Sequence, residues 1–104
     1  VAVLVTDGFE EVELTRPVKA LEKAGAEVFV VSPVSGKKVQ GFHHLDKGSK
    51  VKVDIHLAEA QAEEFSALVL PGGVANPDAL RMDPQAVAFV RAFFSAGKPV
   101  AAIC

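Results

Sequence analysis

The sequence has little of what marks a secreted protein, a membrane protein or a nucleic-acid-binding protein. It contains one cysteine, so no disulfide can form within the chain, which is usual for a reducing compartment. No apolar run approaches the length of about 20 residues that crosses a bilayer, and the opening VAVLV lacks the basic lead and the length of a signal peptide. No continuous basic block is present and the net charge is −2. We therefore expect a cytoplasmic protein whose partners include neither a membrane nor, as a main partner, nucleic acid.

Patterns that bind cofactors and metals are also missing. The segment PGGVANP lacks the spacing of a Walker loop and of a GxGxxG loop, and neither CxxC nor HExxH occurs. His43, His44 and His56 have no obvious ligand partners, and we interpret them as surface residues that stay away from the candidate cleft. We expect no cofactor and no metal.

What the sequence does contain is an alternation of apolar runs and amphipathic segments. Residues 1–5, 26–32, 67–70 and 98–103 are apolar and rich in β-branched residues, as strands buried on both faces are. Helical segments follow the first and third runs, and residues 33–57 form a glycine-containing insertion with alternating valines. This order predicts an α/β fold, a doubly wound parallel sheet with a small antiparallel excursion.

The two helices carry recognisable start and stop signals. In the first, residues 9–25, Pro17 predicts a kink or a restart with Thr15 as N-cap, and Gly25 ends the helix. In the second, residues 83–97, Asp83 is the N-cap and Gly97 the stop. Its predicted apolar face consists of Val87, Val90 and Phe94.

Chemistry in such sheets gathers beyond the carboxyl ends of the strands. Cys104 lies at the end of the fourth strand, where a turn into a helix would hold the sulfur clear of the sheet. The dipole of that helix would favour the thiolate, and a thiolate is a nucleophile. The alternative is a small buried hydrophobe, which is how most free cysteines behave.

The third strand ends in LPGG, where Gly72 and Gly73 form a tight turn. Glycines also let backbone N–H groups approach a ligand, and such donors stabilise an oxyanion by roughly 3 kcal/mol each. The loop can be a tight turn and also an oxyanion-binding loop. The cysteine predicted at a nearby strand end favours the oxyanion-binding role.

The segment DGFEEVEL places three carboxylates at the start of the first helix. Glu10 and Glu11 fit a solvated first turn that suits the helix dipole. Glu13 lies between apolar residues and is predicted to face inward. A buried carboxyl can stay protonated and donate a hydrogen bond to a thiolate.

Taken together, three segments resemble the ThiJ/PfpI family, the superfamily of the PfpI intracellular protease and the parkinsonism-linked deglycase. They are VLVTDGFEEVELTRP, EEFSALVLPGG and GKPVAAIC, and residues 71–104 resemble the bacterial PfpI-like stress-protein branch. The resemblance implies a flavodoxin-like, class I glutamine amidotransferase-like domain, of which residues 1–104 would be the N-terminal part, ending at the nucleophile elbow. It implies that Cys104 is the nucleophile, that Glu13 hydrogen-bonds it, and that Gly72 and Gly73 shape the oxyanion pocket.

The resemblance also implies an activity and an assembly. It suggests a cofactor-free, cysteine-dependent hydrolase of the stress response that acts on reactive carbonyls or glycated adducts, in a glyoxalase or deglycase manner, or on peptides. The family forms its site at a subunit interface, so a homo-oligomer, a dimer or a hexamer, is expected, with a histidine directly after the cysteine. The alternative is a redox-sensing or chaperone-like stress protein that uses the same oxidisable cysteine without turnover.

Overall fold

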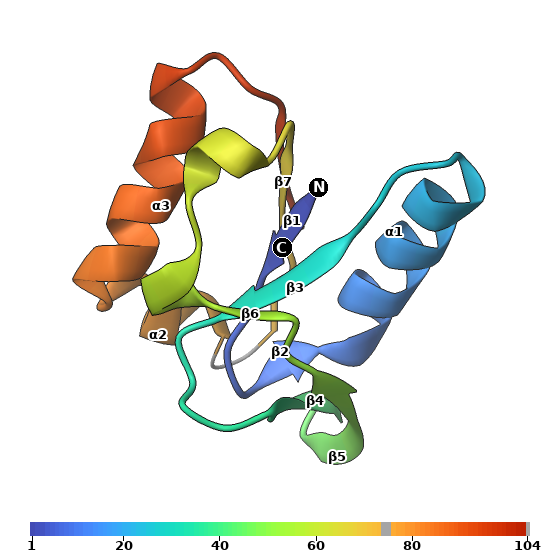
Figure 1. The fold of residues 1–104 in the computed structure, drawn as a ribbon. Helices are drawn as coiled ribbons and strands as arrows, with labels where there is room; N and C mark the ends of the chain where they lie inside the picture. Colours follow the sequence, from blue (N-terminus) through green and yellow to red (C-terminus); the bar gives the residue numbers. More distant parts are fainter. Residues whose placement is uncertain (74–75, 104) are drawn as a thin grey trace.

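The computed structural model describes residues 1–73 and 76–103, and its core is a five-stranded parallel sheet (Figure 1). The strand order is β6-β3-β1-β7-β8. Neighbouring strands pair in parallel throughout, which places their carboxyl ends at one edge. The strands are β1 (Ala2–Leu4), β3 (Phe29–Ser32), β6 (Ile55–His56), β7 (Leu68–Leu70) and β8 (Val100–Ala102).

Helices cover both faces of this sheet. Figure 1 shows α1 (Glu11–Lys23) on one side, and α2 (Asn76–Arg81) and α3 (Pro84–Ser95) on the other. Two 3-10 turns, η1 (Leu57–Glu59) and η2 (Ala62–Glu64), pack against α3. The predicted doubly wound, flavodoxin-like architecture is confirmed. β1 lies in the centre of the parallel sheet, with β3 and β6 on one side of it and β7 and β8 on the other, and helices cover both faces. No described helix has the length and apolar character needed to cross a membrane.

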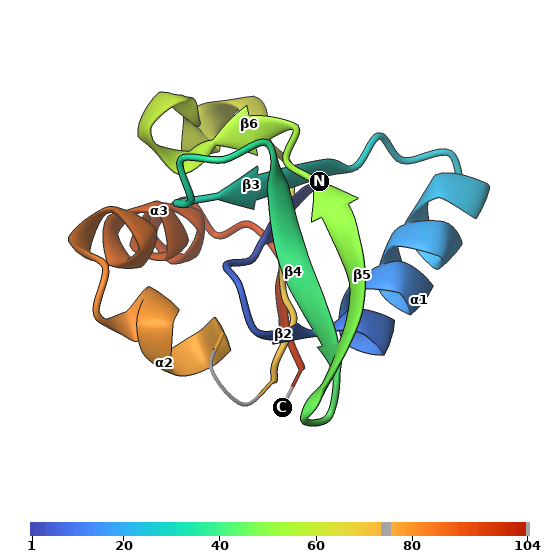
Figure 2. The same ribbon diagram turned by 90° about the horizontal axis from the view of Figure 1, so that it is seen from below.

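The antiparallel excursion is a hairpin of β4 (Lys38–His43) and β5 (Asp46–Lys52), and Figure 2 shows its two strands side by side over their full length. It confirms the prediction for this insertion, while its parallel pairing with the short strand β2 (Phe9–Glu10) was not foreseen. β2 lies between β1 and α1 in the chain, so this pairing attaches the hairpin to the carboxyl edge of the main sheet.

The side chains of β1 alternate between two apolar cores. Ala2 and Leu4 belong to a cluster with Phe89 and Phe93 of α3, and Val3 belongs to the opposite cluster. All three β1 residues are fully buried, as predicted for a strand covered on both faces. Burying a large apolar side chain stabilises the fold by roughly 1.5–3 kcal/mol, so β1 is the centre around which both layers pack.

α1 runs without interruption through Pro17, so the predicted restart with Thr15 as N-cap is wrong. The proline ring removes one backbone donor, and the tertiary packing of Leu14 and its neighbours compensates for that loss. Gly25 ends the helix as predicted, with a φ of +94° and its N–H donating to Glu22 O.

α3 begins as predicted but buries a different face. The Asp83 carboxylate accepts from Gln85 N at 2.9 Å and Ala86 N at 3.3 Å, which confirms the N-cap. The predicted face is wrong: Phe94 is 65% exposed, and the buried residues are Ala86, Phe89 and Phe93. The buried set of residues is shifted by one position from the predicted set. The face with two phenylalanine rings packs against the sheet because these rings bury more apolar area.

β8 is less buried than its sequence predicts. Ala101 and Ala102 are exposed and Val100 is half-buried, so the expectation of a strand buried on both faces is wrong. Within the described ranges β8 pairs only with β7 and forms an edge of the sheet. Val100 nevertheless packs against the apolar cluster that contains Phe89 and Phe93 of α3.

Candidate functional site

The carboxyl ends of β1 and β7 are fixed to each other by one buried amide. Asn76 is fully buried, and its Oδ1 accepts from Thr6 N at 2.7 Å. Its Nδ2 donates to Pro71 O at 2.8 Å. No role was predicted for Asn76, whose only signal in the sequence is its position shortly after the glycine loop. Asn76 makes the two strand ends one rigid frame.

Glu13 is bound to this frame through the glycine loop. Its carboxylate Oε1 accepts from Gly72 N at 2.7 Å, and the side chain is half-buried in the first turn of α1. The predicted inward orientation is therefore observed. A residue in a helix thus contacts a loop that lies 59 positions later in the sequence.

The glycine loop approaches the backbone after β1 so closely that no side chain fits. Gly73 has a φ of +128°, and a Cβ built there would lie 2.7 Å from both Glu10 N and Gly8 O. Gly72 O accepts from Glu10 N at 2.9 Å, and Gly72 N–H is engaged by Glu13. No described residue accepts a hydrogen bond from Gly73 N–H. Of the two predicted oxyanion donors, Gly73 is thus the one that no described group occupies.

The predicted nucleophile, Cys104, lies outside the described residues, and its role stays a prediction. The last described residue, Ile103, donates its N–H to Leu70 O at 2.9 Å. The order β1-β7-β8 brings the ends of the first, third and fourth predicted strands to one edge, as expected.

A cleft of about 530 Å³ opens beside Glu13 at this edge. Its lining includes both adjacent histidines of the hairpin, His43 and His44, so the expectation that they stay away from the cleft is wrong. The prediction of a surface position is also wrong for His56. This residue lies half-buried in β6 of the main sheet, with its Nδ1 3.0 Å from Val34 O. The full lining comprises Glu10, Val12, Glu13, His43, His44, Leu45 and Gly73.

Glu10 and Glu11 hold the hairpin to the start of α1. The Glu10 carboxylate accepts from His44 N at 3.1 and 3.2 Å, and Glu11 Oε1 accepts from Ser49 N at 2.5 Å. Glu11 Oε2 lies 2.8 Å from His43 Nε2. The interpretation of both residues as a merely solvated first turn is wrong, because each carboxylate bonds to a distant segment.

The environment of Glu11 favours its charged form. The hydrogen bond from Ser49 N–H lowers the pKa of the Glu11 carboxyl from its ordinary value of 4.5, and the imidazole of His43 lowers it further. Partial removal from water acts in the opposite direction but does not outweigh the hydrogen bond. This carboxylate stays ionised at neutral pH and orients His43 at the mouth of the cleft.

We expect Glu11→Gln to destabilise the protein in a pH-dependent way. Because the folded-state pKa is lowered, the carboxylate contributes stability above its unfolded pKa, and the contribution is lost as the pH falls through the folded value. The difference in unfolding free energy between wild type and E11Q should therefore be largest above about pH 5 and shrink below about pH 4. Urea unfolding from pH 3 to 7 measures it. The control Glu22→Gln, at an exposed position of the same helix, should show no such pH dependence.

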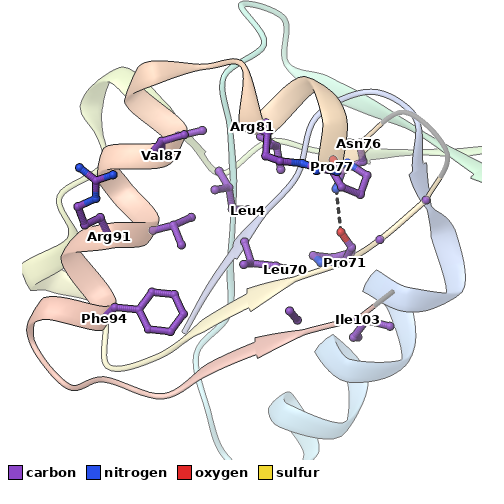
Figure 3. Close-up of a pocket in the computed structure, with 16 residues that line it drawn as sticks. Leu4, Leu70, Pro71, Asn76, Pro77, Arg81, Val87, Arg91, Phe94 and Ile103 are labelled. Carbon is purple, nitrogen blue, oxygen red and sulfur yellow. Dashed lines mark hydrogen bonds between the residues drawn. The ribbon is translucent and has the colours of Figure 1, made fainter.

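A second, apolar cavity of about 670 Å³ lies on the other side of the glycine loop (Figure 3). Leu70 and Ile103 line it from the sheet, and Val87, Val90 and Phe94 line it from α3. Its charged lining residues in the described part of the chain are Arg81 and Arg91, and no carboxylate side chain is among them. The face of α3 that the sequence analysis assigned to the core forms a wall of this cavity. Among the described residues, carboxylates and histidines thus line the cleft around Glu13 and not this cavity. Residues 1–73 and 76–103 contain no group of three or more histidine, cysteine or carboxylate side chains placed to hold a metal ion.

Comparison with known proteins gives a single answer over the whole chain. The model of the DJ-1/PfpI family matches residues 1–104. YraA of Bacillus subtilis, provisionally named a cysteine protease, is 47% identical over 104 residues and is covered to 59% of its length. Protein/nucleic acid deglycase 2 of Escherichia coli is 46% identical over 105 residues and is covered to 58%. Both alignments include 100% of this chain.

The fold gives the same result. The crystal structure of DJ-1beta from Drosophila melanogaster superposes on 99% of this chain and 53% of its own, with a TM-score of 0.86 and 28% sequence identity. The chain thus spans a little more than half the length of the proteins that it resembles.

Proposed function

The chain belongs to the DJ-1/PfpI family, and from this membership we propose that it is part of a cofactor-free enzyme that attacks small carbonyl compounds or glycated adducts with the thiolate of Cys104. Its relatives include proteins named deglycases and one provisionally named a cysteine protease, and these names support an enzymatic activity. Methylglyoxal-type adducts are the substrates that we favour, and peptides are the alternative for the same nucleophile. Because the chain spans less than two thirds of its relatives, the activity is proposed for the whole protein.

The observation that carries this proposal is the bond between Glu13 and the glycine loop. A carboxyl group and a backbone donor that has no acceptor among the described residues, Gly73 N–H, lie at the carboxyl edge of the sheet, where β8 also ends. Carbonyl addition needs a proton-transfer group and an oxyanion donor, and these two groups can supply them.

The proposed reaction begins with attack of the thiolate on the carbonyl carbon. The C–S bond forms while the carbonyl π electrons move to oxygen, and the N–H of Gly73 stabilises the resulting oxyanion. Glu13 transfers the proton to or from the adduct, and His43, held by Glu11, is a second proton carrier at the same cleft. With methylglyoxal, the C–H proton of the hemithioacetal carbon then moves through an enediol to the neighbouring carbonyl carbon, which converts the adduct into a thioester without an external oxidant. Water adds to the thioester carbonyl, the C–S bond breaks, and the hydroxy acid leaves with the thiolate restored.

Glu13→Gln tests the proton-transfer role. The glutamine oxygen can still accept from Gly72 N–H, so the loop should stay in place, but the amide cannot exchange a proton as a carboxyl does. We expect kcat/KM for methylglyoxal to fall about 100-fold with little change in thermal stability. Glu22→Gln on the exposed side of α1 should retain the wild-type rate. A rate for Glu13→Gln within a factor of three of wild type would exclude this role.

A further inference from the structure

The hairpin of β4 and β5, with the residue before it, carries most of the lysines of the molecule. Five of the eight lysines lie within residues 37–52, a segment in which Asp46 is the one carboxylate, although the chain as a whole has a net charge of −2. A second cleft, of about 600 Å³, lies against this hairpin. It is lined by Asp7, Lys37, Lys38, Gln40, Phe42, Lys47 and Lys50.

The pairing of the two strands explains how separate lysines come together. Lys38 lies directly opposite Lys52, Gln40 opposite Lys50, and Phe42 opposite Lys47. Alternate side chains of a strand point to opposite faces, so Lys38, Gln40 and Phe42 share one face, while His43 lines the cleft of Glu13. The basic cleft and the cleft of Glu13 therefore lie on different faces of the same hairpin.

This concentration of charge is not neutralised within the described part of the chain. None of the five lysines forms an ion pair there, and the Asp7 carboxylate accepts from the backbone of Gln40. Like charges directly opposite in a hairpin, such as Lys38 and Lys52, destabilise it. An arrangement that costs stability and leaves cations exposed is suited to an anionic ligand.

We propose that this face of the hairpin binds single-stranded nucleic acid. From Lys47 to Lys52 the basic row extends over roughly 17 Å, which suits a chain of phosphates spaced at a few ångströms better than one compact anion. Phe42 lies half-buried in the same cleft and offers a ring on which a base can stack. The expectation that nucleic acid is not a main partner was based on the absence of a continuous basic block, whereas here the strand pairing assembles the block. The site requires neither Cys104 nor Glu13, so it stands independently of the proposed enzymatic activity.

Binding of a fluorescently labelled 15-nucleotide single strand, followed by anisotropy at several salt concentrations, tests the proposal. The triple variant Lys38→Gln/Lys47→Gln/Lys50→Gln should bind at least tenfold more weakly, and its slope of log affinity against log salt should be smaller by about 2. The matched control Arg16→Gln/Lys19→Gln/Lys23→Gln removes the same charge from the exposed side of α1 and should bind within twofold of wild type. Phe42→Leu, which keeps an apolar side chain, should weaken binding about tenfold because stacking is lost.

Several outcomes would overturn the proposal. Equal losses of affinity in the hairpin variant and the α1 variant would show that binding depends only on the net charge of the protein. Unchanged affinity of Phe42→Leu would show that no base stacks on this ring. Inorganic tripolyphosphate competing as well as the oligonucleotide, or binding to anionic phospholipid vesicles in its place, would assign the face to another anion. Unchanged circular dichroism and thermal midpoints ensure that each variant is folded.

Discussion

Replacing Cys104 with alanine is expected to lower the turnover of methylglyoxal by a factor of at least about 1,000. The proposed reaction passes through a covalent bond to this sulfur, and the remaining groups, a carboxyl and a backbone donor, cannot form that bond. Cys104→Ser should lose nearly as much, because a serine hydroxyl is not ionised at neutral pH without a dedicated base. Loss of the dicarbonyl and appearance of the product, both followed by NMR, measure the rate.

The control for this experiment is the fold itself. Thermal midpoints of both variants should stay within a few degrees of wild type, so that a lost rate reports chemistry and not unfolding. A rate for Cys104→Ala within tenfold of wild type would remove the thiol from the mechanism. If wild type itself shows no turnover, and a mass increase at Cys104 under peroxide tracks protection of an unfolding client protein, the redox-sensing alternative is the correct one.

The architecture was predictable because it depends on local composition. Runs such as residues 1–5 and 67–70 are apolar at successive positions, which is a property of strands with a helix layer on each side, and the glycines at 25 and 97 end the helices that they follow. The register between strand ends then follows from the parallel order. This is why the sequence alone places Glu13 and the glycine loop at the same edge of the sheet.

The attachments of the hairpin could not be predicted in the same way. Glu10 and Glu11 bond to backbone groups that lie 34 and 38 residues later, and Asn76 bonds to one that lies 70 residues earlier. No local pattern distinguishes a carboxylate that meets a distant N–H from one that meets water. The buried face of α3 was missed for a related reason, since helical periodicity allows two apolar faces one residue apart and only the packed sheet selects between them.

The same close packing makes Gly73 the position where the largest loss of stability is expected. For Gly73→Ala we expect the free energy of unfolding to fall by about 4 kcal/mol, which for a domain of this size corresponds to a midpoint lower by about 20 °C. The new Cβ would lie 2.7 Å from Glu10 N and Gly8 O and 3.0 Å from Phe9 C, all backbone atoms of the segment that joins β1 to α1. Backbone atoms cannot move aside as the end of a flexible side chain can.

A matched variant separates this close approach from the strain of the backbone conformation. Gly25 also has a positive φ, +94°, but a Cβ there would meet no atom within 4 Å. Gly25→Ala should therefore cost only about 1 kcal/mol, the usual penalty for a side chain in the left-handed region. Urea unfolding of both variants gives the comparison, and equal losses would show that the contact with residues 8–10 is not the cause. If the contact is the cause, Gly73→Ala also displaces Glu10 and with it the hairpin. Hydrogen exchange at His44 N, whose acceptor is the Glu10 carboxylate, should then accelerate in Gly73→Ala and stay unchanged in Gly25→Ala.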